Sequence, residues 1–279
     1  MKSKAFAKIN LGLKIIGKRS DGFHDIETVF AKIGLHDDLE FRLRKDSKIL
    51  VKVMGAQIPS RKNLVWRAAY SLQKFLPKKI GVEIKLKKRI PLGGGLAGGS
   101  SDCAATLRAL SKLWGLKLPR EKLEKIGSGL GSDVAFFLRG GVQRGRGRGE
   151  ILENMKLPKN FPREVLVVVP EFGVSTSEAF AKLSISRKQA LKPIFKDPVN
   201  LPDIWEVNDL ENDFEKVIFE EFPILAEIKK KLLKGGAKFA SLSGSGSAVF
   251  GLFSSREKLK KTEQDFSGFG ETFISRIRE

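Results

Sequence analysis

Apolar residues recur at every second position near the start of the chain, which is the period of a β-strand. From Ala5 to Ile16 one face is apolar and the other carries polar residues such as Lys8 and Asn10, so we predict a strand with one face in water. Ile26 to Ile33 predicts a second strand. The turn formers of Gly17 to Gly22 lie between the two, and the arrangement indicates a hairpin.

After the two predicted strands, the spacing of apolar residues changes to that of a helix. Apolar residues three or four apart predict a helix over Asn63 to Phe75, and a half-exposed strand comes next at Val82 to Leu86. A second helix begins after a glycine-rich stretch, where Ser100 or Ser101 is the natural N-terminal cap. The first half of the chain therefore mixes helices and strands.

The later part repeats this mixture. We predict strands at Glu164 to Pro170, Phe239 to Ser243 and Ala248 to Phe253. A helix that ends at a pair of glycines is predicted between them, with inward residues Leu225, Ile228, Leu232 and Leu233. A stretch rich in proline and lysine, Met155 to Arg163, marks a domain boundary, so we expect domains at residues 1–157 and 158–279.

Composition narrows the class of protein. With 279 residues, 41% hydrophobic and 30% charged, the chain can bury a core, which excludes a disordered or fibrous protein. One cysteine and two histidines cannot form a disulfide or the usual structural zinc site. The apolar runs are shorter than the ~20 residues of a membrane helix, and the first residues lack the apolar stretch of a secretion signal. We expect a cytoplasmic protein.

The charge favours anionic partners. Lys and Arg number 52 against 32 acidic residues, a net charge of +20 that suits nucleic acid, an acidic membrane surface or a phosphorylated small molecule. A lysine-rich surface also serves solubility and is common in heat-adapted proteins. The charge alone does not choose among these.

The strongest local motif has five glycines within Gly93 to Gly99, between a predicted strand and a capped helix. Such a loop lets backbone amides at a helix start bind phosphate. It is not a Walker A loop, because no lysine precedes Ser100. A dinucleotide fold would need a fully apolar strand before the loop and an acid at the end of the next strand, and a protein kinase would need His-Arg-Asp and Asp-Phe-Gly motifs. The chain has none of these.

Three other features are ambiguous taken singly. Lys8 on a strand is ordinarily solvated, and Asp133, just before the apolar Val134 to Leu138, is ordinarily a helix cap. Arg144 to Gly149 alternates arginine with glycine, as nucleic-acid-binding segments do, but it is short and lacks aromatic residues. We interpret it as a basic hairpin.

Taken together, and in this order along the chain, the motifs resemble those of the GHMP kinase superfamily. They are Lys8-Ile9-Asn10, Gly17-Lys18-Arg19, Asp21-Gly22-Phe23-His24, the loop Pro91 to Ser101, Leu130 to Phe137, Asn208-Asp209-Leu210-Glu211 and Leu242 to Phe250. The first elements narrow the resemblance to the branch that phosphorylates a cytidine diphosphate-linked methylerythritol in the non-mevalonate isoprenoid pathway. The resemblance covers nearly the full length.

The resemblance implies roles for individual residues. ATP would be bound by Pro91, Leu92, Gly93, Gly94, Gly95, Leu96, Ala97, Gly98, Gly99, Ser100 and Ser101. The residue matching Asp133 acts as base on the substrate hydroxyl, and the one matching Lys8 lies beside it, where an ammonium keeps a carboxylate ionised and offsets charge on the transferred group. The substrate would contact Asn10, Phe23, His24, Phe30, Thr176 and Phe180, and which phenylalanines stack on cytosine stays open.

The expected fold is α+β, with an N-terminal lobe like the second domain of ribosomal protein S5 and a ferredoxin-like C-terminal lobe. Mg²⁺ should accompany ATP, with Ser101 the nearest candidate to touch it and no protein ligand assigned. Asp102 is expected at the surface or as an acid favoured at a helix start. Two alternatives stay open: a GHMP kinase for homoserine, mevalonate or a sugar, and a basic nucleic-acid-binding protein.

Overall fold

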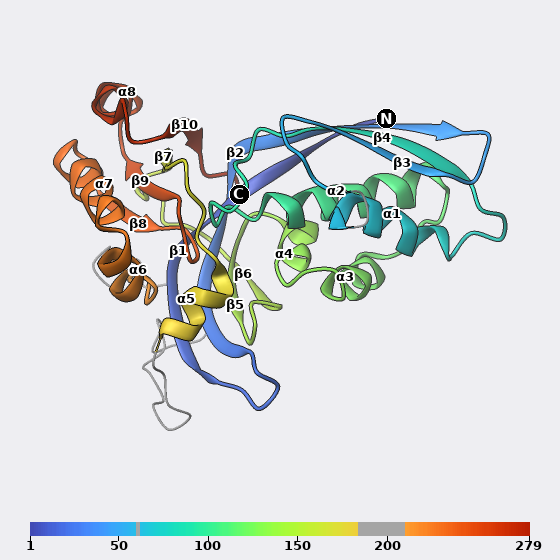
Figure 1. Cartoon of the computed structure of the whole chain (residues 1–279), viewed down its shortest axis with the longest axis horizontal. Helices are drawn as coiled ribbons and strands as arrows, with labels where there is room; N and C mark the ends of the chain where they lie inside the picture. Colours follow the sequence, from blue (N-terminus) through green and yellow to red (C-terminus); the bar gives the residue numbers. More distant parts are fainter. Residues whose placement is uncertain (60–61, 184–209) are drawn as a thin grey trace. The chain divides into compact units, whose positions relative to one another are not determined.

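The computed structural model of the chain describes residues 1–59, 62–183 and 210–279 (Figure 1). It forms two compact units that are discontinuous in sequence. Unit 1 comprises Met1–Ala7, His36–Ile90 and Ala97–Gly140, and unit 2 comprises Lys8–Leu35, Pro91–Leu96 and Gly141–Glu279. Both contain helices and strands, which confirms the α+β class; the division at residue 157 stays a prediction. The polar stretch 184–209, with Asn208 and Asp209, lies outside the described residues.

Two long strands run through both units, β1 (Lys2–Lys18) and β2 (His24–Arg44), and they pair as the predicted hairpin. In unit 1 the end of β2 pairs antiparallel with β4 (Gly81–Lys87), which pairs parallel with β3 (Ile49–Met54). Helices α1 (Leu64–Gln73) and α2 (Gly98–Leu113) lie side by side along these strands, followed by α3 (Arg120–Ser128) and α4 (Val134–Arg139) (Figure 1).

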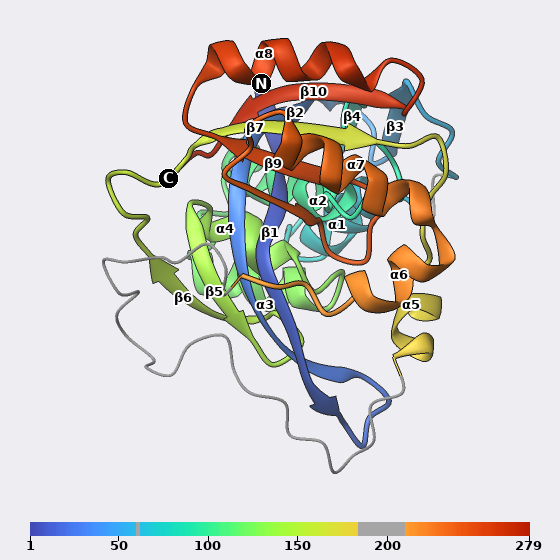
Figure 2. The same ribbon diagram turned by 90° about the vertical axis from the view of Figure 1, so that its left-hand side faces the viewer.

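In unit 2 the start of β2 pairs with β5 (Val142–Arg146), which forms a hairpin with β6 (Ile151–Met155). A separate antiparallel sheet has the order β10-β7-β9-β8, with β7 (Glu164–Val169), β8 (Phe239–Leu242), β9 (Val249–Phe253) and β10 (Glu271–Arg276). Helices α7 (Pro223–Lys234) and α8 (Arg256–Glu263) lie along its strands (Figure 2). The remaining elements are α5 (Thr176–Lys182), α6 (Glu215–Glu221) and a short 3₁₀ helix, Gln264–Phe266.

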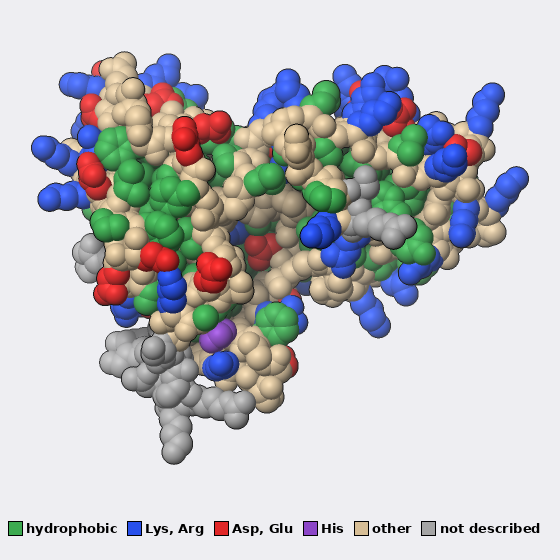
Figure 3. Space-filling view, viewed as in Figure 1, with side chains coloured by type: hydrophobic (Ala, Val, Ile, Leu, Met, Phe, Trp, Pro, Cys, Tyr) green, Lys and Arg blue, Asp and Glu red, His purple; other side chains and the backbone are tan. Residues whose placement is uncertain are grey.

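Most predicted elements are confirmed, including the three strands and the helix of the later part. The apolar stripe of α7 packs against this sheet through Leu225, Ile228 and Leu232, all fully buried. Leu233 was expected inward and is 44% exposed, because it lies one position beyond the buried stripe. Lys and Arg side chains project over the visible surface among fewer acidic ones, as the charge of +20 requires (Figure 3).

Two local predictions were wrong. The polar face of β1 is not wet: Lys8 and Asn10 are 4% and 2% exposed, because polar groups from distant segments cover them. Helix α2 is not capped by Ser100 or Ser101; it begins at Gly98 after Ala97, which has a left-handed φ of 55°. Among the described helices, none has the length and apolarity that crossing a membrane would take.

Candidate active site

The glycine-rich segment is divided between the two units. Its first part, Pro91–Leu96, packs in unit 2 against the turn that joins β8 to β9. The amide of Ala248 donates to the Gly94 carbonyl (3.2 Å), and the Ser243 hydroxyl donates to the Gly95 carbonyl (3.1 Å). Gly95 has a φ of +72°, and an added Cβ would lie 1.9 Å from the Ser243 carbonyl oxygen. Only glycine fits there.

The second part opens α2 in unit 1. The amide of Ser101 bonds to the Ala97 carbonyl (3.0 Å), so the amides of Gly98, Gly99 and Ser100 are those that a helix start leaves without an intrahelical partner. Such amides bind anions. A Cβ on Gly131, in the Leu-Gly-Ser-Asp segment, would lie 3.3 Å from the Ser100 hydroxyl oxygen. The structure thus brings the start of α2 close to the segment that carries Asp133.

Lys8 is buried within unit 2, which overturns the solvated alternative. Its ammonium donates to the Asn10 side-chain oxygen and to the Gly95 carbonyl, both at 2.6 Å, and lies 5.8 Å from the Phe30 ring centroid. Asn10 in turn donates to the Thr28 hydroxyl (2.8 Å). The network therefore holds a positive charge directly against the glycine-rich segment.

Asp133 stands before α4 in unit 1 and is half-buried. It occupies the N-cap position that the sequence suggested, but its side chain makes no capping hydrogen bond. The role of this carboxylate as a base stays a prediction. Lys8 belongs to unit 2, and its pairing with Asp133 stays a prediction.

The predicted substrate-binding residues of unit 2 differ in how exposed they are and in what their side chains contact. His24 stacks on Phe180 with ring centroids 4.6 Å apart and planes 10° from parallel. Burial, and then the charge of Lys18, lower the pKa of His24, so the imidazole is neutral near pH 7. Phe23 is 50% exposed beneath the Arg148 guanidinium, whereas Phe30 is 2% exposed in the core. The exposed Thr176 lies 2.9 Å from the Ser245 hydroxyl.

Comparison with known proteins identifies the family. The model of the GHMP kinases N terminal domain matches residues 63–141, and the GHMP kinases C terminal model matches 201–272. The chain belongs to the GHMP kinase family. As a GHMP kinase it is a small-molecule kinase that uses ATP as co-substrate.

Individual GHMP kinases extend the match over nearly the whole chain. A 4-diphosphocytidyl-2-C-methyl-D-erythritol kinase of Chlorobium phaeobacteroides is 42% identical, covering 99% of this chain and 96% of its own. One of Thermodesulfovibrio yellowstonii is 39% identical, covering 95% and 94%. A crystal structure of 4-(cytidine 5'-diphospho)-2C-methyl-D-erythritol kinase covers 100% of both chains with 32% identity and a TM-score of 0.81.

This GHMP kinase contains a buried charge cluster that sequence reasoning missed. Asp102 was expected at the surface or as an acid at a helix start. It is 2% exposed beyond the first turn of α2, where it accepts a hydrogen bond from Lys88 (2.9 Å). The same ammonium donates to Asp37 (2.5 Å). The expectation failed because the partners lie on β2 and after β4, and no local pattern links them.

The residues of this GHMP kinase fit a metal that arrives with ATP. Among residues 1–59, 62–183 and 210–279, no three His, Cys, Asp or Glu side chains gather as a metal site. Mg²⁺ is usually held by one or two protein oxygens with substrate phosphates and water. The Ser101 hydroxyl donates to the Phe6 carbonyl (2.6 Å) and is buried, so the half-buried Ser100 and Asp133 offer the more accessible oxygens.

Proposed function

We propose that the protein transfers the γ-phosphoryl group of ATP to the 2-hydroxyl of 4-diphosphocytidyl-2-C-methyl-D-erythritol in the non-mevalonate isoprenoid pathway. The supporting relatives carry that substrate in their names and match nearly end to end. The observation that carries the chemistry is the buried ammonium of Lys8, held against Gly95 of the phosphate loop. A cytoplasmic location accompanies the proposal.

Binding and orientation of ATP belong to the loop Pro91 to Ser101. Amides at the start of α2 receive the triphosphate, and Lys8 supplies positive charge next to the loop. Bound Mg²⁺, held by phosphate oxygens with the Ser100 hydroxyl, would neutralise charge on the transferred group. Phosphoryl transfer requires little covalent chemistry from the protein, so positioning and electrostatics dominate.

Asp133 is the proposed base. Its carboxylate accepts the proton of the 2-hydroxyl as the oxygen attacks the γ-phosphorus and ADP leaves, and Lys8 stabilises the charge on the entering oxygen. The neutral His24 can offer one donor and one acceptor to the cytosine edge, and its stacked partner Phe180 supplies a ring face. Asn10, Phe23, Phe30 and Thr176 complete the proposed substrate set.

The test of this mechanism is Asp133→Asn, which keeps the size of the side chain and removes the base. Single-turnover phosphoryl transfer should fall by at least about 100-fold, because general base catalysis contributes roughly 10²–10⁴. Near-wild-type transfer would contradict the proposal. A panel of the cytidine substrate, homoserine, mevalonate and a sugar separates the other GHMP kinases, which have no reason to prefer a cytidine compound.

The nucleic-acid alternative loses its main support. Arg144 of the basic hairpin is 7% exposed and donates to the buried Glu27 (2.6 Å), and Arg146 pairs with Glu153. The hairpin is confirmed as β5 and β6. Arg144 and Arg146 are engaged in ion pairs with carboxylates of the protein, so steep salt-dependent oligonucleotide binding through this segment is not expected.

A further inference from the structure

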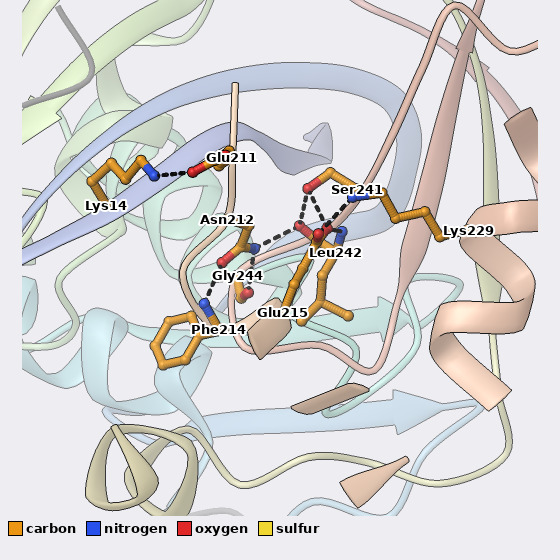
Figure 4. A network of polar contacts seen from close by, with 9 residues as sticks. All are labelled: Lys14, Glu211, Asn212, Phe214, Glu215, Lys229, Ser241, Leu242 and Gly244. Carbon is orange, nitrogen blue, oxygen red and sulfur yellow. Dashed lines mark hydrogen bonds and ion pairs between the residues drawn. The ribbon is translucent and has the colours of Figure 1, made fainter. Parts of the chain in front are cut away.

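The segment Glu211 to Glu215, which ends at the first residue of α6, joins distant parts of unit 2 through polar side chains (Figure 4). Asn212 is its most buried polar member, at 2% exposure. Its amide nitrogen donates to the carbonyls of Leu242 and Gly244, each at 2.8 Å, and its oxygen accepts from the Phe214 amide (3.0 Å). Both amide hydrogens and the oxygen of Asn212 are therefore in use.

The residues around Asn212 fix the segment from two sides. Toward β1, the Leu13 amide donates to the Glu211 carbonyl, and the Asp213 amide donates to the Leu13 carbonyl, both at 2.9 Å. The Asp213 carboxylate also accepts from the Ile15 amide (2.9 Å). Toward β8, the Glu215 carboxylate accepts from the Leu242 amide (2.9 Å) and from Lys229 (2.5 Å) (Figure 4). The segment is thus anchored to the strand that carries Lys8 and to the end of β8.

The two carbonyls that Asn212 holds flank Ser243, which touches the proposed active site. The Ser243 hydroxyl donates to the Gly95 carbonyl (3.1 Å), and the same oxygen accepts the Lys8 ammonium (2.6 Å). A Cβ on Gly244 would lie 3.5 Å from the Lys8 nitrogen. The turn at Ser243 and Gly244 therefore forms one wall around the ammonium and supports the glycine-rich segment.

We propose that Asn212 is a positioning residue for phosphoryl transfer: it holds the Ser243–Gly244 turn against Gly95 and Lys8, and so fixes the ammonium and the phosphate-binding backbone. The inference rests on the proposed function, and Asn212 itself contacts no reacting atom. An amide suits this place because it donates twice and accepts once. An aspartate would set a carboxylate oxygen against two carbonyl oxygens.

The experiment compares Asn212→Ala, Asn212→Asp and Asn212→Ser with Thr262→Val. Thr262 is a control because it is also 2% exposed in unit 2 and donates to the Gly235 and Lys258 carbonyls (2.7 and 2.8 Å), away from the loop. Unfolding midpoints should fall similarly in Asn212→Ala and Thr262→Val. The alanine and aspartate variants should lose about 10-fold or more in kcat, with a raised KM for ATP. The KM for the cytidine substrate should change less than about twofold.

Asn212→Ser keeps one donor and should give intermediate kinetics, which provides a folded variant if the alanine protein is too unstable to assay. Wild-type kcat and KM for ATP in the serine and alanine variants would overturn the inference. So would an equal kinetic loss in Thr262→Val, because the effect would then reflect general destabilisation. Lys8→Met and Asp133→Asn are measured alongside. If these two also transfer at the wild-type rate, the proposed function fails; if only the Asn212 variants do, the positioning role alone fails.

Discussion

Lys88 and Asp102 bracket the glycine-rich segment in the chain, and they meet inside unit 1, where the ammonium donates to the carboxylate across 2.9 Å. Lys88 follows β4, and Asp102 lies in the second turn of α2. A Cβ on Gly98 would lie 3.1 Å from the same nitrogen. The contact closes residues 88–102 into a loop whose ends are fixed, which limits the conformations open to the glycine-rich backbone.

The two carboxylates share Lys88 unequally. Asp37 also accepts from the amides of Arg89 (2.5 Å) and Ile90 (2.8 Å). Asp102 accepts from Lys88, and among the described residues its second oxygen is buried without a hydrogen-bond partner. Burial raises the pKa of Asp102 to about 8, since the Lys88 charge offsets it only in part and the Asp37 charge adds to it. A pKa near 8 predicts that Asp102 is largely protonated at neutral pH.

This predicts a pH dependence of stability. An acid whose pKa is higher in the folded than in the unfolded protein favours folding when protonated, so the free energy of unfolding should decline as pH rises from about 4 to about 8. Lys88, whose pKa is raised above 10.5, keeps its charge throughout. Asp102→Asn cannot ionise and should flatten the profile, with a difference on the order of 4 kcal/mol between pH 5 and 8.5. Urea unfolding across this range measures both slopes, and equal slopes would refute the assignment.

The sequence predicted elements well and burial poorly, for one physical reason. Alternation and helical spacing report on a chain segment and its own faces, so β7 and α7 were found from their residues alone. The burial of Lys8 depends on Gly95, 87 positions away, and that of Asp102 on Asp37 and Lys88. Asn212 shows the same limit. The tetrad Asn212-Asp213-Phe214-Glu215 differs from the one before it, Asn208-Asp209-Leu210-Glu211, only at the third residue, and this near-repetition is the one sequence signal that marks Asn212.

Gly95→Ala should damage both folding and ATP binding. The alanine methyl would meet the Ser243 carbonyl at 1.9 Å, so the β8–β9 turn must move in addition to the strain of a φ of +72°. Gly115→Ala isolates the strain alone, because Gly115 has a φ of +68° and nothing within 4 Å of an added Cβ. We expect the free energy of unfolding in urea to fall by at least about 2 kcal/mol more in Gly95→Ala than in Gly115→Ala. The KM of Gly95→Ala for ATP should also rise, and identical losses in the two variants would exclude the proposed close packing.

Phe180 should contribute selectively to binding of the cytidine substrate. Its ring stacks on His24 and contacts Phe214 edge-on, so one side is fixed by protein while the ring stays only partly buried. Stacking of a base on an aromatic side chain is worth roughly 1–3 kcal/mol, so Phe180→Ala should raise the dissociation constant of the substrate about 5- to 150-fold. ATP binding should be unchanged.

The matched control for Phe180→Ala is Phe269→Ala. Phe269 is a partly buried phenylalanine of the same unit that contacts Phe266 edge-on, and its loss should affect stability without affecting the substrate. Calorimetric titration of both variants with the cytidine substrate and with an ATP analogue makes the comparison. Because the His24 imidazole is neutral near pH 7, substrate affinity should not change between pH 7 and 8.5 through this residue. Equal weakening of both ligands in Phe180→Ala would show that the ring supports the fold and not the base.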